Sequence, residues 1–383
     1  MIYPQLGEEH ELVRKAAAEF VERYVEPAAR RIDSGEYPRD LLREMGKLGL
    51  LAPHIPQEYG GAGLDFRSLV VVVEEIARAS PALATIAEVQ ASMIAYDLLH
   101  FAHQSVKERW LPQVARGEKI VAFALSEPCC GSDAAAIETR AERLGGVWRI
   151  SGTKLWITSG LYADAYLVAA RTGPREERHK SITLFLVERG PCVEARPVVV
   201  MGMHGTGTAE VKLEGCEVGD EAVVGGVNGG FSVVLEDLNN GRTNVGAIGL
   251  GIARAALAEA WGYARRRTAF GRAIAEFQVV QHYIAELFAR IEAVRNVVYT
   301  AAYLRDRGDA SFPIYAQIAK LMGSRLAADA ARTAVQIMGG FGYSTDSKSE
   351  MLYRDAKATE IYEGANEVVL NSLYRLAEKS LFG

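Results

Sequence analysis

The spacing of apolar residues changes twice along this chain of 383 residues, and these changes constrain its fold more than any other feature. Residues 8–118 and the residues after 229 repeat apolar side chains every three or four positions, which predicts amphipathic helices. Between them, short β-branched runs alternate with Gly and Pro turns, which predicts strands. The fold is therefore predicted to be α+β and mainly α, with domains at residues 1–118, 119–225 and 226–383.

The first part is predicted to be an N-terminal helical domain. Its first apolar stripe runs from Leu12 to Tyr24, and Pro27 is expected to end that helix. Three further apolar stretches predict helices: Leu41–Leu50, Leu69–Ala79 and Ile86–Phe101.

The middle part is predicted to be a small β-barrel or sandwich domain, and the last part a four-helix bundle. The predicted strands are Ile120–Leu125, Val147–Lys154, Ala165–Ala170, Ile182–Val187, Val193–Val200 and Ala209–Leu213. The predicted C-terminal helices are Gly246–Arg267, the helix carrying the stripe Ile284–Val298, Pro313–Met338 and Val368–Leu381.

Composition and charge limit the classes of function. The chain is 49% apolar and 24% charged, as globular proteins are. Its formal net charge of -5 argues against a general nucleic-acid surface, which needs clustered Lys and Arg. No uncharged apolar run approaches 18 residues, and Met1–Leu6 lacks the features of a signal peptide. We therefore expect no membrane span and a cytoplasmic protein.

The four cysteines point to a reducing compartment. Cys129 and Cys130 are adjacent, whereas Cys192 and Cys216 stand apart, and neither a CxxC pair nor a His cluster accompanies them. Neither a zinc site nor a disulfide framework is therefore expected.

Five short segments combine glycine turns with polar and aromatic side chains. They are Phe123–Asp133, Lys154–Gly160, Arg267–Gly271, Gln336–Tyr343 and Ile361–Glu367. Taken singly, each has an ordinary structural reading as a turn, a strand end, a helix cap or a loop. Their joint order and separations are not explained by turn chemistry alone.

Two nucleotide-binding patterns are absent or incomplete. No GxxxxGK[ST] segment occurs, so a P-loop is not predicted. Gly249-Leu250-Gly251 begins like a dinucleotide fingerprint, but Arg254 occupies the third small position and no strand precedes the run. These glycines predict close packing of helices instead.

The five segments together resemble the acyl-CoA dehydrogenase family, flavoproteins that introduce a double bond between Cα and Cβ of an acyl thioester. The resemblance covers nearly the whole chain and implies FAD as the cofactor. Contacts of the flavin and its pyrophosphate within one subunit are implied for Phe123, Leu125, Ser126, Gly131, Ser132, Trp156 and Thr158.

The resemblance also implies that each cofactor site is shared between subunits. Positions that reach the FAD of a neighbouring subunit, or its adenosine diphosphate part, are matched by Arg267, Phe270, Gln278, Gln336 and Gly340. Ala365 and Glu367 are further cofactor positions; a Thr is common where Ala365 stands, so only its backbone is expected to contribute. A shared site implies an oligomer, a homotetramer built as a dimer of dimers.

Glu363 matches the family's general base. A proton next to a thioester carbonyl needs a carboxylate in contact whose pKa is near the working pH. Burial against flavin and acyl chain is expected to raise the pKa of Glu363 from its ordinary value of about 4.3. The backbone N–H of Glu363 is expected to bind the thioester oxygen, and Gly364 allows the ligand to approach closely.

Some family members carry the base on the long helix, just before the Arg that matches Arg242. Here that position is Gly241, which has no acid–base group and so favours Glu363 as the base. Asn239 and Arg242 are expected to contact CoA or to support the turn, and Ser132 to lie by the incoming thioester. These residues and Gly364 form the predicted substrate set.

Residues 81–99 are expected to line the acyl pocket. They are mostly apolar, with Glu88 and Gln90 as exceptions, and they include no Arg to bind a second carboxylate. An apolar, short- to medium-chain acyl-CoA is therefore expected, with an electron-transfer flavoprotein as the acceptor. An acyl-CoA oxidase, a dehydrogenase of a carrier-protein or steroid thioester, and a non-catalytic binding or assembly protein remain open alternatives.

Overall fold

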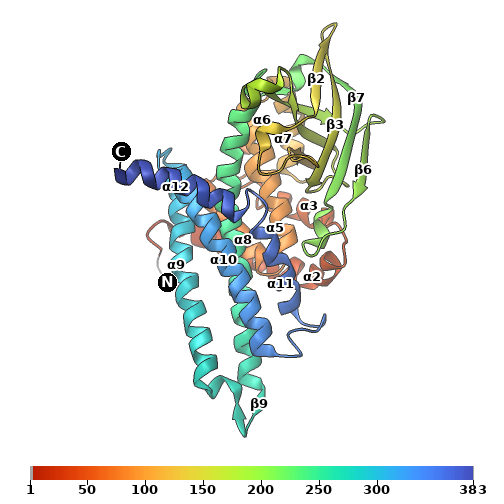
Figure 1. The fold of residues 1–383 in the computed structure, drawn as a ribbon. Coiled ribbons are helices and arrows are strands. Elements are labelled where there is room, and N and C mark those ends of the chain that lie inside the picture. Colours follow the sequence, from red (N-terminus) through yellow and green to blue (C-terminus); the bar gives the residue numbers. More distant parts are fainter. Residues whose placement is uncertain (1–2, 383) are drawn as a thin grey trace.

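The computed structural model describes residues 3–382, with side chains up to residue 378. It has a helical part, a middle sheet and a second helical part in chain order, and it confirms the mainly helical fold (Figure 1). Met1 and Ile2, which begin the segment argued not to be a signal peptide, lie outside the described residues.

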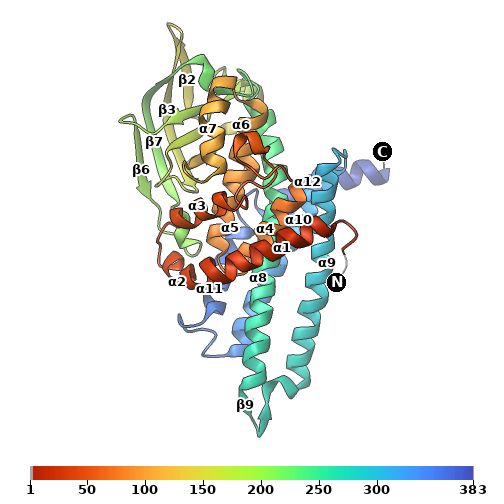
Figure 2. The same ribbon diagram turned by 180° about the vertical axis from the view of Figure 1, so that it is seen from behind.

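The N-terminal helices cover one side of the molecule, as Figure 2 shows from behind. Their bounds are α1 (Glu8–Phe20), α2 (Glu26–Asp33), α3 (Arg39–Lys47), α4 (Phe66–Ala77), α5 (Pro81–Glu88), α6 (Tyr96–Phe101) and α7 (Gln104–Ala115). The prediction that Pro27 ends the first helix is wrong. A π-helical turn, Val21–Val25, joins α1 to α2, and Pro27 lies in the first turn of α2, where its missing N–H is tolerated.

The run Pro81–Phe101 passes from α5 through the π-helical turn Val89–Ala95 into α6. By length and hydropathy it could cross a membrane, but 89% of its most apolar 18-residue window is buried inside the protein. It also carries Glu88 and Asp97. In this fold it is a core helix that packs against α8.

The middle part is one eight-stranded sheet in the order β6-β7-β3-β2-β4-β5-β8, with β1 parallel to β4. The strands are β1 (Val121–Ala124), β2 (Arg140–Leu144), β3 (Val147–Ile157), β4 (Ala165–Arg171), β5 (Ile182–Glu188), β6 (Val193–Pro197), β7 (Ala209–Val218) and β8 (Val223–Val224). The sequence did not predict β2, because this hairpin partner of β3 is charged and largely exposed. Its pairing comes from the Gly145-Gly146 turn, not from apolar alternation.

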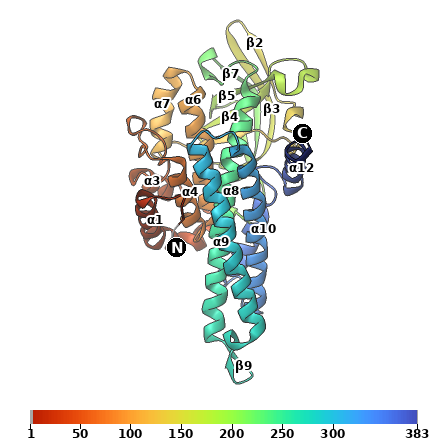
Figure 3. The ribbon, with the colours of Figure 1, turned by 90° about the vertical axis from the view of Figure 1, so that its left-hand side faces the viewer.

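Three long helices, α8 (Gly230–Arg266), α9 (Gln278–Asp306) and α10 (Phe312–Met338), lie side by side in the last part (Figure 3). The shorter α11 (Lys348–Thr359) and α12 (Asn366–Phe382) follow. A small hairpin, β9 (Thr268–Ala269) with β10 (Arg272–Ala273), closes the far tip between α8 and α9.

The long helix α8 begins at Gly230, not at Gly246 as predicted. Burial of this first segment overrides the weak helix propensity of Asn240 and Gly241. The predicted close packing of its glycines is confirmed: a Cβ on Gly249 would lie 2.3 Å from the carbonyl oxygen of Gly323 on α10.

The expectation that the cysteines form no disulfides is wrong. The structure joins Cys192 to Cys216, from the start of β6 to β7, and Cys129 to its neighbour Cys130. Sequence spacing could not reveal the first pair, because the register of β6 and β7 brings the two residues together. The cysteines therefore no longer support a reducing compartment.

Candidate active site

Glu363 lies on the turn between α11 and α12. Its backbone takes the left-handed conformation with φ 54°, and Gly364 after it has φ 93°. The sequence assigned unusual angles only to the glycine. A left-handed glutamate is strained and persists where its surroundings hold it. Among the hydrogen bonds of residues 3–382, none is donated by the backbone N–H of Glu363, which leaves this donor available.

Side chains from two long helices hold this turn. Lys320 on α10 donates to the carbonyl oxygen of Glu360 at 3.2 Å and to Asn366 Oδ1 at 2.7 Å. The backbone N–H of Asn366 returns to the same carbonyl at 3.0 Å. Arg242 Nε on α8 donates to the carbonyl oxygen of Glu363 at 3.1 Å. Lys320 and Asn366 were not predicted; the only sequence signal was a lysine within a largely apolar helix.

The carboxyl of Glu363 packs against Gly241 on α8. A Cβ at position 241 would lie 2.7 Å from Glu363 Oε2, so any side chain there would displace the carboxyl. Oε2 is buried and has no hydrogen-bond partner among the described side chains. Burial raises the pKa of Glu363 to about 7, although the charges of Arg242 and Lys320 lower it. The site thus holds a carboxyl that can take up a proton near neutral pH.

The run Pro81–Phe101 lies opposite this turn. Thr85 Oγ1 is 3.5 Å from the hydroxyl of Tyr362, the residue before the base. One turn further, Glu88 is completely buried, and Ser92 Oγ donates to its Oε2 at 2.9 Å. Burial, and then the charge of Glu363, raise the pKa of Glu88 well above its usual range. Two carboxyl groups therefore interact across the site.

Two of the predicted cofactor segments meet just after the end of β1, beside the last residues of β3. The backbone N–H of Leu155 donates to the carbonyl oxygen of Ser126 at 2.9 Å. Lys154 is buried beneath them and donates to the Leu125 carbonyl at 3.0 Å and to Glu127 Oε1 at 2.7 Å. Burial lowers the pKa of Lys154 to about 8, and Glu127 opposes this shift. This buried ion pair, which the sequence did not predict, fixes both segments.

Trp156 projects from the end of β3 toward solvent. The pairing of β3 with β7 shifts register between Lys154 and Ile157, and Trp156 there has φ 64° and is 58% exposed. A bulge of this kind re-aims a side chain out of the ladder. The neighbouring predicted residues range from exposed Gly131 and Ser132, through partly exposed Phe123, Ser126 and Thr158, to buried Leu125. An open indole with exposed backbone beside it fits a planar ligand and its phosphates.

The other predicted cofactor residues lie at the far tip of the long helices. Arg267, Phe270 and Gln278 surround the β9–β10 hairpin, at the end of the molecule away from the sheet (Figure 1). Phe270 is 96% exposed. Gln336 and Gly340, at the end of α10, are also exposed. One chain therefore does not bring these five residues to Trp156.

The remaining predicted residues surround the turn. Arg242 Nη1 donates to Asn239 Oδ1 at 3.3 Å, so these two side chains form one unit on α8. Ala365 is partly exposed beside Gly364, and Glu367 is exposed in the first turn of α12.

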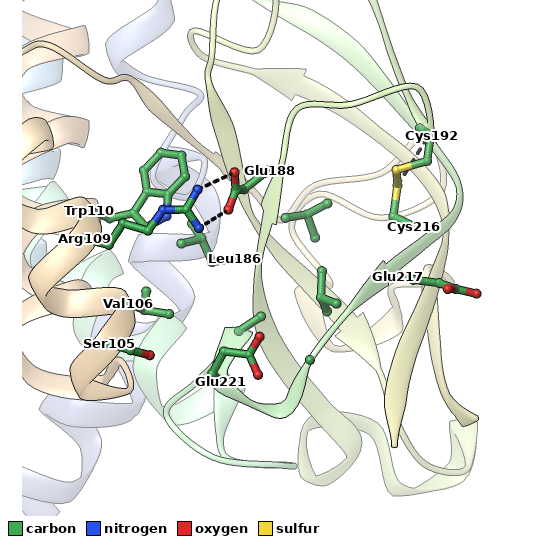
Figure 4. A pocket seen from close by; sticks show the side chains of 14 residues that line it. Ser105, Val106, Arg109, Trp110, Leu186, Glu188, Cys192, Cys216, Glu217 and Glu221 are labelled. Carbon is green, nitrogen blue, oxygen red and sulfur yellow. Dashed lines mark hydrogen bonds and ion pairs between the residues drawn. A yellow bond between two sulfur atoms is a disulfide. The ribbon is translucent and has the colours of Figure 1, made fainter. Parts of the chain in front are cut away.

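Two other features lie apart from these residues. A surface pocket of about 430 Å³ between α7 and the sheet is lined by Arg109, Trp110 and Glu188 near the Cys192–Cys216 disulfide (Figure 4). It contains none of the predicted site residues. His204 contacts the carbonyl oxygens of Asp33 and Val200 at 2.8 and 3.1 Å, which is a structural role.

Family models match almost the whole chain. The acyl-CoA dehydrogenase N-terminal domain matches residues 7–118, the middle domain residues 122–216 and the C-terminal domain residues 228–377. An acyl-CoA dehydrogenase of Bacillus subtilis is 38% identical over 364 residues, which cover 94% of this chain and 96% of the relative. A 3-(aryl)acrylate reductase of Clostridium sporogenes shows the same identity and coverage. The human mitochondrial short-chain specific acyl-CoA dehydrogenase is 36% identical, over 95% of this chain and 89% of the relative.

Solved structures show the same fold. The butyryl-CoA dehydrogenase of Megasphaera elsdenii has a TM-score of 0.94 and 34% identity, with coverage of 98% of this chain and 100% of the other. A chain in the structure of the electron transferring flavoprotein of Acidaminococcus fermentans has a TM-score of 0.94 and 35% identity, covering 99% of both chains.

Proposed function

Because the chain belongs to the acyl-CoA dehydrogenase family of FAD-dependent oxidoreductases, we propose that it desaturates a short- to medium-chain acyl-CoA between Cα and Cβ. The observation that carries this proposal is Glu363, a base whose Oε2 is buried and unpaired and whose pKa is about 7. Similarity to short-chain specific and butyryl-CoA dehydrogenases supports the short end of the range.

The chain's own residues support removal of a proton from Cα. Glu363 accepts that proton, while its backbone N–H is free to donate to the thioester oxygen and stabilise the developing negative charge. Arg242 and Lys320 hold the turn and place positive charge near the base. Bound FAD would supply the hydride acceptor for Cβ. Trp156 and the segment from Phe123 to Ser132 are the residues that we propose to hold its flavin and pyrophosphate.

The two separated groups of cofactor residues support a shared site. Arg267 and Phe270 lie exposed at the helix tip, away from the sheet edge of their own chain. Arg suits phosphate because it stays charged and donates in a planar fork. We propose a homotetramer in which this tip completes the FAD site of a neighbouring subunit. Arg267→Ala is expected to weaken FAD retention and assembly together, measured by flavin absorbance and by solution mass. Unchanged values for both would contradict the shared site.

A panel of acyl-CoAs scored by anaerobic loss of flavin absorbance tests the proposed reaction. Short saturated acyl-CoAs are expected to bleach the flavin fastest. A purified protein that retains no FAD after reconstitution, or that no saturated thioester bleaches, would contradict the proposal.

The same panel separates the alternatives. Rapid turnover in air would indicate an oxidase. A preference for a carrier-protein thioester would indicate that the acyl group is carried by a protein instead of CoA. The electron-transfer flavoprotein is our proposed acceptor, on the evidence of the Acidaminococcus structure. The equal similarity to a 3-(aryl)acrylate reductase makes reduction of an α,β-double bond the second candidate. Reoxidation of reduced flavin by an enoyl thioester, without bleaching by the saturated one, would favour it.

A cytoplasmic location stays a prediction. The disulfides count against the cysteine argument for it.

A further inference from the structure

Glu88 is a buried carboxyl with an unused oxygen. It lies at the end of α5, its exposed fraction is 0%, and Ser92 Oγ donates to its Oε2 at 2.9 Å. Its Oε1 has no hydrogen-bond partner among the described side chains. Glutamate is almost never fully buried without a partner, because an unmade hydrogen bond in the interior is costly.

Two further buried acceptor oxygens, one on the base and one on α8, also have no partner in the part of the chain that the structure describes. Across the site, Glu363 Oε2 is also buried and unpaired. On α8, Asn244 lies on the same helix face as Gly241, the residue against which the base packs. Asn244 donates to the Asn240 carbonyl at 3.3 Å, but its own Oδ1 is buried without a partner. Glu88 Oε1 and Glu363 Oε2 are thus two buried acceptors without a partner among the described side chains, and the charges of their carboxyl groups interact.

Gln90, the other polar residue expected in the acyl pocket, behaves differently. Its amide donates to the Val121 carbonyl at 2.8 Å and accepts from the Val121 N–H at 3.1 Å. Both ends of Gln90 are therefore used to attach the helix to β1. Glu88 makes no such connection, so the fold does not explain its carboxyl.

Resting on the proposed function of this site, we propose that Glu88 is a specificity-determining residue and that the substrate is a short acyl thioester whose chain carries a hydrogen-bond donor, a hydroxyl or an amino group. The donor fills the acceptor position that Oε1 leaves open. A second carboxylate on the chain is disfavoured, because it would meet two acidic side chains. No Lys or Arg lies between residues 81 and 99 to compensate it.

The protonation of Glu88 suits both donors. Burial, and then the charge of Glu363, raise the pKa of Glu88 and so favour its neutral form, which can accept a hydrogen bond from a hydroxyl and also donate one. An ammonium group on the chain would instead stabilise the carboxylate as an ion pair. Replacing the Glu88 carboxyl by an uncharged amide should therefore affect the thioester with an ammonium group more than the one with a hydroxyl.

Three matched thioesters test this proposal: hexanoyl-CoA, 5-hydroxypentanoyl-CoA and 5-aminopentanoyl-CoA, which differ only in the terminal group. The measured quantity is kcat/KM from flavin bleaching. At least one donor-bearing thioester is expected to exceed hexanoyl-CoA roughly 10- to 100-fold, the range of a charge-assisted hydrogen bond. Glu88→Leu is expected to abolish or reverse this preference.

Glu88→Gln gives an independent reading if the leucine variant fails to fold. The amide preserves a bond to the hydroxyl but cannot neutralise an ammonium, so it is expected to reduce only the amino preference. Asp97→Asn is the matched control, since Asp97 is a second fully buried carboxyl on the same helical run. Its preference ratio is expected to stay at the wild-type value.

The outcomes separate the two proposals. If no saturated thioester bleaches the flavin, the proposed function fails. If hexanoyl-CoA bleaches it as fast as the donor-bearing thioesters, or if the Glu88 variants keep the wild-type ratio, only the assignment of Glu88 is overturned.

Discussion

Two buried glutamates on successive helices, Glu74 on α4 and Glu88 on α5, show opposite uses of a carboxyl in this protein. Both have an exposed fraction of 0%. Glu74 accepts from Arg254 at 2.8 Å, from Arg295 at 3.0 Å and from the Tyr299 hydroxyl. Glu88 has only the hydroxyl of Ser92.

Their pKa values shift in opposite directions because of these partners. Burial alone would raise the pKa of Glu74, but the charges of Arg254 and Arg295 lower it to about 2. Burial raises the pKa of Glu88, and no cation opposes it. The paired carboxylate joins α4 to α8 and α9, whereas the carboxyls of Glu88 and Glu363 remain available for a ligand. The partners of a buried carboxyl, rather than its burial, thus decide the direction of its pKa shift.

The largest effect, a loss of kcat, is expected when the base Glu363 is replaced. Glu363→Gln should lower kcat roughly 10²–10⁴-fold, the usual contribution of a general base, because an amide cannot accept the α-proton. FAD content, read from the visible spectrum, should remain. Flavin bleaching at the wild-type rate would show that the base lies elsewhere.

Removing the charge of the paired carboxylate, Glu74, should reduce the stability of the fold instead of the rate. Glu74→Gln leaves Arg254 and Arg295 without their shared carboxylate, and breaking such a buried pair costs about 3–5 kcal/mol. Denaturant unfolding measures the loss. The control is Glu188→Gln, which breaks an exposed 2.7 Å ion pair with Arg109 and should cost less than about 1 kcal/mol. Equal losses of unfolding free energy in both variants would contradict the structural role of the buried Glu74 ion pairs.

A single methyl group should disturb the base without touching its chemistry. Gly241→Ala adds a Cβ that would lie 2.7 Å from Glu363 Oε2, which is too close, so the carboxyl must move. A displacement of about 1 Å commonly costs about 10²-fold in rate. Gly262→Ala, on the same helix with only an Arg266 side chain at 3.7 Å, should leave kcat unchanged. An active Gly241→Ala enzyme would argue against this placement of the base.

The smallest effect is a change with pH, which should alter the activity that depends on Glu363 and the stability that depends on Glu74 over different pH ranges. Glu363 must be deprotonated to act, so kcat/KM should fall about tenfold per unit below its pKa of about 7 and level off above it. Glu74 has a folded pKa of about 2, below its ordinary 4.5, so its stabilisation is present above pH 4.5 and is lost as pH falls toward 2. Between pH 5 and 8, activity should therefore change while Glu74 contributes constantly to stability. A flat activity profile across this range would contradict the raised pKa.

Much of the site could be predicted from its turn chemistry. The segment Ile361–Glu367 identified Glu363, and Gly241 excluded the alternative position of the base. Lys320 and Asn366 escaped prediction because their contact crosses from α10 to the turn over a sequence separation of 46 residues. The Cys192–Cys216 pair and strand β2 escaped for a related reason, since register and hairpin pairing decide them.

The sequence by itself determined the helical, β and helical order and the candidate base, because hydrophobic period and glycine turns are local properties. Only the tertiary structure decided which buried carboxyls pair with a cation. That depends on whether a cation on another helix comes within hydrogen-bonding distance, as Arg254 does for Glu74 and as no side chain described here does for Glu88 Oε1. A pKa is a property of the surroundings in space, and the chain order does not specify them.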